Sequence, residues 1–276
     1  MSWFVIALVG PIFLACANQT DKHLLDEHLH GEVGSLIIFS SLFSAVALPI
    51  IVMADPAAYA VGLGLGVLLA INGMLTVIAV LFYFYALSED DASCVVPFYQ
   101  TIPIFALALG YIILDETISA TQAAASLVIL FGATILSFEM QHGSFRFKRN
   151  VVLYMLGASL LYAVNSVLFK LFALEVGFWR VLFWDVVGKL VLGFGFLGFV
   201  PSYRRQFVTV LRNNKAVVLS LSSISELLHV AGEAATAYAT MLAPVALVLI
   251  VSLLQPLFVL IIGVVLTLLF PKIEIE

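Results

Sequence analysis

Nine apolar runs, each close to the length of a bilayer-crossing helix, occupy most of this sequence. They lie at 2–18, 34–53, 60–87, 93–114, 118–139, 151–173, 178–200, 215–240 and 243–270. The hydrocarbon core of a bilayer is about 30 Å thick, and a helix crosses it with about 20 apolar residues. Because lipid cannot hydrogen-bond an exposed backbone, a spanning segment must be a helix or part of a closed barrel. Runs of this length predict an all-α polytopic membrane protein.

The composition excludes most soluble classes. Hydrophobic residues make up 63% of the 276 residues and charged residues only 11%, whereas a soluble domain is roughly half apolar and a quarter charged. The formal net charge is −5 and no long basic run is present, so nucleic acid binding is not expected. The two cysteines lack metal-ligand spacing, and no ATP-binding or cofactor motif occurs. We expect an integral, multi-pass protein of the cell inner or plasma membrane, without a cofactor.

A segment of the first half of the sequence returns in the second half. Residues 96–110 resemble residues 249–263, and the matched prolines Pro103 and Pro256 are 153 residues apart. Internal repeats with helix-breaking residues at corresponding positions are typical of secondary transporters. The expected units are a first repeat over 1–140, a basic connector over 141–150 and a second repeat over 151–276.

The repeat predicts more helices than the sequence supplies. Five of the nine apolar runs precede the connector and four follow it. A five-helix unit crosses the membrane an odd number of times, so a second copy must be inverted. We therefore expect a ten-helix fold of two inverted repeats, with the tenth helix missing from this chain.

Basic residues in the connectors predict an orientation, because lysine and arginine in short loops favour the cytoplasm. The connectors after the first, fifth, seventh and ninth runs hold nine of the twelve Lys and Arg residues. This distribution places Met1 on the side opposite the cytoplasm.

Three titratable residues of the eighth run share one helix face. Glu226, His229 and Glu233 are spaced i, i+3 and i+7, which at about 100° per residue confines them to a sector roughly 60° wide. Charged groups inside a bilayer are costly and are therefore functional-site candidates. Glu233, the deepest of the three, is the expected coupling group, exchanging a proton for substrate as a cavity changes sides. The alternative places Glu226 and His229 among the lipid headgroups and pairs Glu233 with a neighbouring helix.

Other polar side chains interrupt the apolar runs. Asp185 and Lys189 are one helical turn apart and can neutralise each other, either as a satisfied pair or while lining a cavity. Lys170 lies near the end of its run, where it can snorkel to the headgroups or attract an acidic substrate. Asn72 and Asn165 can bind substrate or join helices.

Prolines interrupt the fourth and ninth runs. Pro103 and Pro256 each follow a glutamine closely, Gln100 and Gln255 respectively. Proline leaves an earlier carbonyl without its helical partner, which a membrane tolerates where protein or a wet cavity satisfies that group. We therefore expect the fourth and ninth helices to line the pathway, with simple kinks as the alternative.

Five segments carry a resemblance to a known family. They are NQTDK at 18–22, YFYAL at 83–87, VPFYQTIPIF at 96–105, LDETIS at 114–119 and APVALVLIVSLLQPLF at 243–258. Through them the sequence resembles the EamA-type transporters of the drug/metabolite transporter superfamily over nearly its whole length. The resemblance implies two inverted five-helix repeats, a central substrate cavity, alternating access and export of small metabolites. It also implies that both termini lie in the cytoplasm, which differs from the charge-based orientation.

These features predict a secondary transporter rather than an enzyme, with no catalytic residue. We expect it to export small metabolites, such as amino acids or related organic solutes, with protons as the candidate coupling ion. Its partners would be the substrate and the lipid bilayer, and it would be a monomer or a homodimer. The alternative is an intramembrane metal-binding enzyme or metal-ion transporter that uses Glu226, His229 and Glu233, although such sites usually need further glutamates and histidines.

Overall fold

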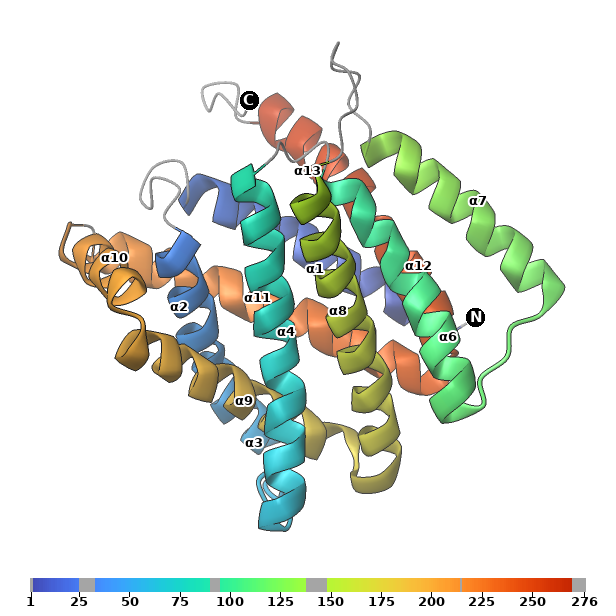
Figure 1. Ribbon diagram of the computed structural model, residues 1–276, viewed down its shortest axis with the longest axis horizontal. Coiled ribbons are helices and arrows are strands. Elements are labelled where there is room, and N and C mark those ends of the chain that lie inside the picture. Colours follow the sequence, from blue (N-terminus) through green and yellow to red (C-terminus); the bar gives the residue numbers. More distant parts are fainter. Residues whose placement is uncertain (1, 25–32, 90–94, 138–147, 214, 270–276) are drawn as a thin grey trace.

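The structure is a computed structural model that describes residues 2–24, 33–89, 95–137, 148–213 and 215–269, and these residues form helices and no strand (Figure 1). The first-half elements are α1 (Ser2–Leu24), α2 (Val33–Phe43), η2 (Ser44–Val46), α3 (Ala47–Ala54), α4 (Leu63–Glu89), η3 (Val96–Thr101), α6 (Ile102–Leu114) and α7 (Ala120–Ser137). The second-half elements are α8 (Arg149–Val176), α9 (Phe178–Phe199), α10 (Pro201–Asn213), α11 (Lys215–Leu242), α12 (Val245–Ser252) and α13 (Gln255–Leu269).

The apolar runs of the sequence coincide with these helices. Within the described residues, seven helical segments are long and apolar enough to cross a membrane, and two shorter apolar helices lie at Phe98–Leu114 and Ala120–Gly132. The prediction of an all-α polytopic membrane protein is confirmed. Most of the predicted connector, residues 141–147, and the place expected for the start of a tenth helix lie outside the described residues.

Two of the apolar runs are interrupted at matched positions. The fourth apolar run changes from the 3-10 helix η3 to α6 at Ile102, and the ninth changes from α12 to α13 at Gln255, 153 residues later. Pro103 and Pro256 each take the second position of the new helix. A proline is tolerated there because the first N–H groups of a helix have no intrahelical acceptor. The helices are therefore restarted at the prolines rather than bent through them.

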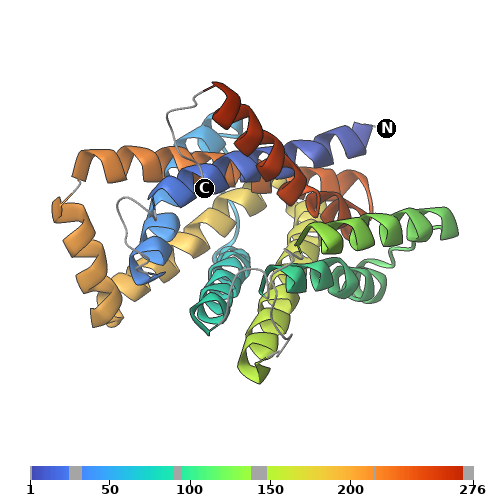
Figure 2. The ribbon, with the colours of Figure 1, turned by 90° about the horizontal axis from the view of Figure 1, so that it is seen from above.

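Contacts between the two halves come in corresponding pairs. α1 lies on α11, as Figure 2 shows, and α4 lies on α8. Likewise α1 contacts α12 and α13, while α8 contacts η3 and α6. Such an exchange of partners is expected of two inverted copies of one unit.

Two glycines allow α4 and α9 to approach closely. A Cβ atom on Gly73 of α4 would lie 2.0 Å from the carbonyl oxygen of Asp185 in α9. A Cβ atom on Gly188 of α9 would lie 1.9 Å from the carbonyl oxygen of Ala70 in α4. Small residues of this kind let backbones meet inside membranes, and here they bring the backbone of Asp185 against α4.

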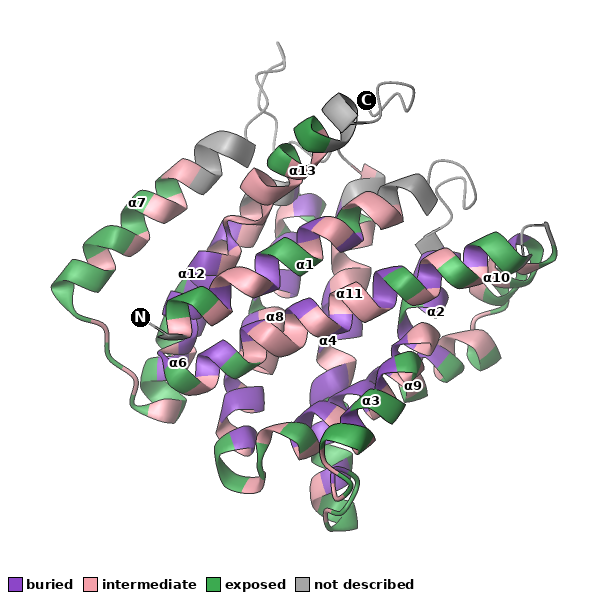
Figure 3. Ribbon diagram, turned by 180° about the vertical axis from the view of Figure 1, so that it is seen from behind, coloured by how far each residue is buried: buried purple, intermediate pink, exposed green. Residues whose placement is uncertain are grey.

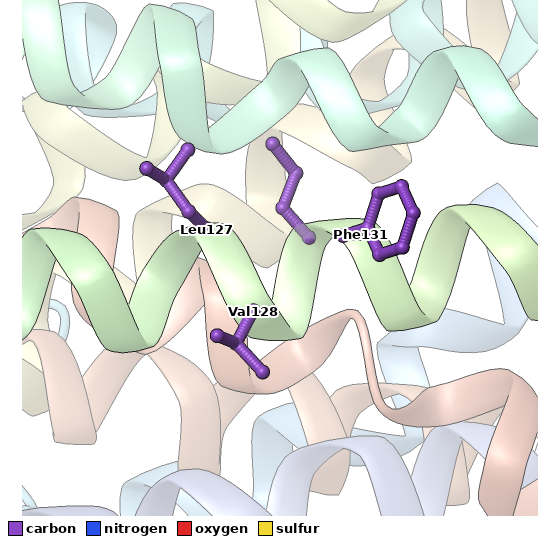
Figure 4. A pocket seen from close by; sticks show the side chains of 4 residues that line it. Leu127, Val128 and Phe131 are labelled. Atoms are coloured by element: carbon purple, nitrogen blue, oxygen red, sulfur yellow. The ribbon is translucent and has the colours of Figure 1, made fainter.

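Helix α7 lies at the edge of the bundle, and none of its described residues is buried (Figure 3). An apolar hollow of about 520 Å³ beside it is lined by Leu127, Val128, Leu130 and Phe131, all of α7 (Figure 4). Because all four lining side chains are apolar, this hollow suits lipid chains better than a polar solute.

Helix α10 was not predicted from the sequence, which indicated only a connector between the seventh and eighth runs. It packs against α2, α9 and α11 through one face. Its apolar residues lie on one face of the helix, and polar residues of the other face separate them in the sequence. They therefore form no long apolar run.

Candidate functional site

A charge network of three residues lies where α9 meets α11. Lys189 of α9 forms an ion pair with Glu233 of α11, and its Nζ atom lies 3.6 Å from Oδ2 of Asp185, one turn earlier. The predicted pair of Asp185 and Lys189 is therefore present, but the lysine also reaches across to a second carboxylate. Asp185 and Lys189 are each 6% exposed. Burying a charged side chain to this extent costs free energy, and the attraction between the paired charges offsets that cost.

Two asparagines join this network to α4 and α8. Asn165 of α8 donates from Nδ2 to the backbone oxygen of Asn72 in α4 at 2.9 Å, and Asn72 donates back to the backbone oxygen of Asn165 at 3.3 Å. The same Nδ2 group of Asn165 donates to Oδ1 of Asp185 at 3.3 Å. The asparagines therefore connect helices, and Asn165 also positions a member of the charge network.

A cavity of about 40 Å³ opens beside the charge network. Its lining includes Asp185, Glu233 and Asn165, together with Thr76, Tyr162, Ser166, Phe169, Leu182, Thr236, Ala237 and Thr240. This volume holds a few water molecules and no metabolite. The hydroxyl-bearing residues of this lining were not among the predicted site residues, because serine and threonine are ordinary packing residues in membrane helices.

Glu226 and His229 lie on the same helix as Glu233 but have other partners. Ser40 donates to Oε2 of Glu226 at 2.9 Å. His229 Nε2 lies 2.8 Å from Oδ2 of Asp21, near the end of α1. Glu226, His229 and Glu233 therefore share one helix face, as the spacing predicted, but each contacts a different helix. Glu226 is buried, with 5% of its surface exposed.

The metal-binding alternative requires ligands that converge. Among the residues with described side chains, no group of three or more His, Cys, Asp and Glu side chains could hold a metal ion. Glu226, His229 and Glu233 are each directed to a separate partner. The geometry does not favour the metal interpretation.

Lys170 is buried, and neither of its predicted environments describes it. Its Nζ atom lies 2.5 Å from Oε1 of Glu116, in the link between α6 and α7, and donates to the backbone oxygen of Ala243 at 2.8 Å. Oε2 of Glu116 accepts the backbone N–H of Val245 at 2.8 Å, at the start of α12. This end lock, the pair Glu116 and Lys170, joins the two halves. Lys170 is held inside the protein by a half-buried carboxylate and a backbone carbonyl rather than extending to the surface.

The glutamines and prolines of the broken helices lie away from the small cavity. Pro103 and Gln100 are buried, and neither lines the cavity beside the charge network. Gln255 and Pro256 open α13 and are also absent from that lining. In their neighbourhood α6 and α12 pack together through an apolar cluster that contains Ile102, Ala106, Val245, Ala246 and Leu249.

The charges of the network do not balance. Asp185 and Glu233 supply two carboxylates, while Lys189 supplies one ammonium group. With all three ionised, one negative charge is in excess. Because a low-dielectric environment strengthens electrostatic attraction, the adjacent space attracts a proton or a cationic group.

The helical arrangement has a counterpart among solved structures. A crystal structure described only as that of a protein matches this chain with a TM-score of 0.59 and 16% sequence identity, covering 96% of this chain and 87% of the other. At that identity the likeness concerns the fold. No curated protein matches the sequence. The sequence model of the EamA-like transporter family matches residues 1–138, half of the chain. The chain is a multi-pass integral membrane protein and belongs to the EamA-like transporter family.

Proposed function

We propose that this protein is a secondary transporter that exports a small amine-bearing metabolite, such as an amino acid, by alternating access, and that protons are its coupling ion. The observation that carries the proposal is the charge network beside a cavity at the meeting of helices from both halves. Ionisable residues inside a membrane are expensive to maintain and mark substrate or proton pathways. Glu233 is the proposed coupling group and Asp185, Lys189 and Asn165 are its proposed neighbours in the site.

The excess negative charge supplies a reason for exchange. Either protonation of Glu233 or the ammonium group of a substrate neutralises the network, so the two compete for one site. Glu233 is the more exposed carboxylate, with its side chain 28% exposed against 9% for Asp185. A proton that enters from one side would then displace the bound substrate to that same side. Each transport cycle would exchange one proton for one substrate molecule.

Polar contacts on either side of the cavity support a closed conformation. The end lock joins the α6–α7 link to α8 and to the start of α12. Towards the other end of α11, Asp21 of α1 contacts His229 and accepts a hydrogen bond from Ser225. We propose that these two sets of contacts open in alternation, and that Glu226 and Ser40 move with the second set.

The proposed moving units are the two repeats, 1–140 and 151–276. The exchanged contacts of α1 and α8, and the helix restarts at Ile102 and Gln255, support this division. In inverted repeats the substrate site lies at the interface between the units. The broken helices around Pro103 and Pro256, with Gln100 and Gln255 beside them, are proposed to flex as the interface rearranges.

The test is charge movement across proteoliposomes on a solid-supported membrane, with the longest natural form of this chain. Amino acids, other amines and non-amine metabolites are applied at several pH values. We expect pH-dependent currents with zwitterionic amino acids, because exchanging a zwitterion for a proton moves net charge, and these currents should fall at least tenfold in Glu233→Gln. Glu175→Gln, an exposed glutamate at the end of α8, is the matched control and should retain them.

Each result has a clear meaning. Currents that survive unchanged in Glu233→Gln would reject this residue as the coupling group. Because electroneutral exchange produces no current, radiolabelled substrate uptake into preloaded vesicles is measured in parallel. No transport of any amine by either method, with a folded protein, would contradict the proposed substrate class.

A further inference from the structure

Helix α10 has two chemically distinct faces. Phe207 packs on Phe39 of α2, with ring centroids 4.6 Å apart, and Val210 is buried. Tyr203 packs on Phe196 of α9 at 5.8 Å. One face of this helix is therefore fixed to the protein.

The other face of α10 is basic and exposed. Arg204, Arg205 and Arg212 are exposed, as are Val208 and Thr209 between them. At about 100° per residue the three arginines fall within a sector about 100° wide. Residues 200–215 contain four basic and no acidic residues, so no carboxylate of this segment neutralises the row.

The position of α10 places this row beside the membrane surface. The helix connects the end of the apolar helix α9 to the start of α11. The Tyr203 hydroxyl lies 3.1 Å from that of Tyr85, near the end of α4, and the Tyr85 ring lies 5.8 Å from Tyr154, in the second turn of α8. Tyrosines gather at the level of the lipid headgroups, so these three rings mark the interface at this end of the bundle.

We propose that the exposed face of α10 binds the phosphate groups of anionic phospholipids through Arg204, Arg205 and Arg212. Guanidinium groups match phosphate oxygens with paired hydrogen bonds. Amphipathic helices with a basic face bind anionic membrane surfaces in this way. Here the apolar face is already held by protein, so the arginines are presented at a fixed height and spacing.

Tyr203 is compatible with the same ligand. Burial, then its hydrogen bond with Tyr85, raises the pKa of Tyr203 to about 12, so the phenol, uncharged at neutral pH in any case, stays uncharged at alkaline pH as well. A neutral hydroxyl at the inner edge of the arginine row does not repel a phosphate.

Bound lipid would hold the two helices of the charge network together. α10 joins α9, which carries Asp185 and Lys189, to α11, which carries Glu233. The binding itself does not depend on the proposed transport activity, and its test needs no transport measurement.

The test counts lipids bound to the purified full chain in detergent by native mass spectrometry. Phosphatidylglycerol and phosphatidylcholine are titrated separately, and glycerol phosphate is added as a soluble competitor. The variants are Arg204→Gln, Arg205→Gln, Arg212→Gln and their triple combination. Arg180→Gln, a basic residue near the start of α9 at the opposite end of that helix, is the matched control for loss of one charge.

We expect phosphatidylglycerol to bind the unmodified chain and Arg180→Gln alike, and phosphatidylcholine to bind at least tenfold more weakly. Each α10 variant should weaken phosphatidylglycerol binding about fivefold, the usual contribution of one basic residue near an anionic surface. Unchanged binding in the triple variant, or an equal loss in Arg180→Gln, would overturn the site. Equal binding of glycerol phosphate would assign it to a soluble phosphate rather than to lipid.

Discussion

Lys170 and Glu116 form an ion pair with 2.5 Å between Nζ and Oε1, and it joins helix α8 of the second half to the α6–α7 link of the first. Both ions have additional backbone partners, because Lys170 donates to Ala243 and Glu116 accepts from Val245. Three segments distant in sequence, namely α8, the α6–α7 link and the α11–α12 link, therefore meet at two side chains. Their side chains are only 9% and 13% exposed, so loss of one partner leaves the other poorly hydrated.

Replacing Glu116 with alanine should destabilise the protein by about 3–5 kcal/mol, the usual cost of leaving one member of a buried pair uncompensated. Lys170→Met should cost a similar amount, because it leaves the carboxylate of Glu116 with only the N–H of Val245, just as Glu116→Ala leaves Lys170 with only the carbonyl of Ala243. Thermal unfolding in detergent measures both. The double variant should lose less than the sum of the single variants, and strictly additive losses would argue against a coupled pair.

Gly188→Ala should disturb the contact between α4 and α9. The new methyl group would meet the Ala70 carbonyl at 1.9 Å, and overpacking of this kind costs about 1–3 kcal/mol. Gly195→Ala is a control in the same helix, since a Cβ atom added there would meet no neighbouring atom within 4 Å, and it should change stability by less than about 0.5 kcal/mol. Similar melting temperatures for the two variants would contradict the close approach.

The asparagine pair should be unequal in its effect. Asn165→Ala removes the donor to both Asn72 and Asp185 and leaves two buried acceptors with fewer partners, which should cost about 1–3 kcal/mol. Asn72→Ala removes one longer hydrogen bond and should cost less. Asn150→Ala, exposed at the start of α8, serves as the control in thermal unfolding. The reverse order of the two buried variants would show that Asn165 does not organise the site.

Membrane orientation can be measured with single cysteines in a chain lacking Cys16 and Cys94. Thr209 of α10 and Tyr59, in the link between α3 and α4, are both exposed. The basic residues around Thr209 predict that Thr209→Cys reacts with an impermeant reagent from the cytoplasmic side and Tyr59→Cys from the other. The opposite labelling pattern would favour the orientation implied by the family resemblance. Labelling of both from one side would contradict the order of crossings.

The helices could be predicted from the sequence because each crossing needs a long apolar run, and that requirement is local. The prolines indicated where the fourth and ninth apolar runs are interrupted, since proline is best tolerated in the first turn of a helix, where Pro103 and Pro256 lie. α10 was not predicted because it contains no long apolar run. Its apolar residues are visible only as one face of a short helix, and its packing on Phe39 joins residues far apart in the sequence.

Partners of the charged residues could be predicted only where they share a helix. Asp185 and Lys189 were paired from their spacing, whereas Glu233 is 44 residues from Lys189 and Asp21 is 208 residues from His229. Lys170 was expected either to snorkel to the headgroups or to attract an acidic substrate, and Glu116 was not predicted as its partner. Nothing local distinguishes those roles from a buried pair, because the pairing depends on how the two halves pack.

The small size of the cavity beside Glu233 has a consequence for how the protein responds to its solvent. About 40 Å³ must expand to admit any metabolite, and the new space must fill with water or solute and empty again in every cycle. Large solutes that are excluded from that space draw water out of it and favour the compact form. Turnover should therefore slow as the concentration of an impermeant osmolyte rises, even when substrate and ion gradients are held constant.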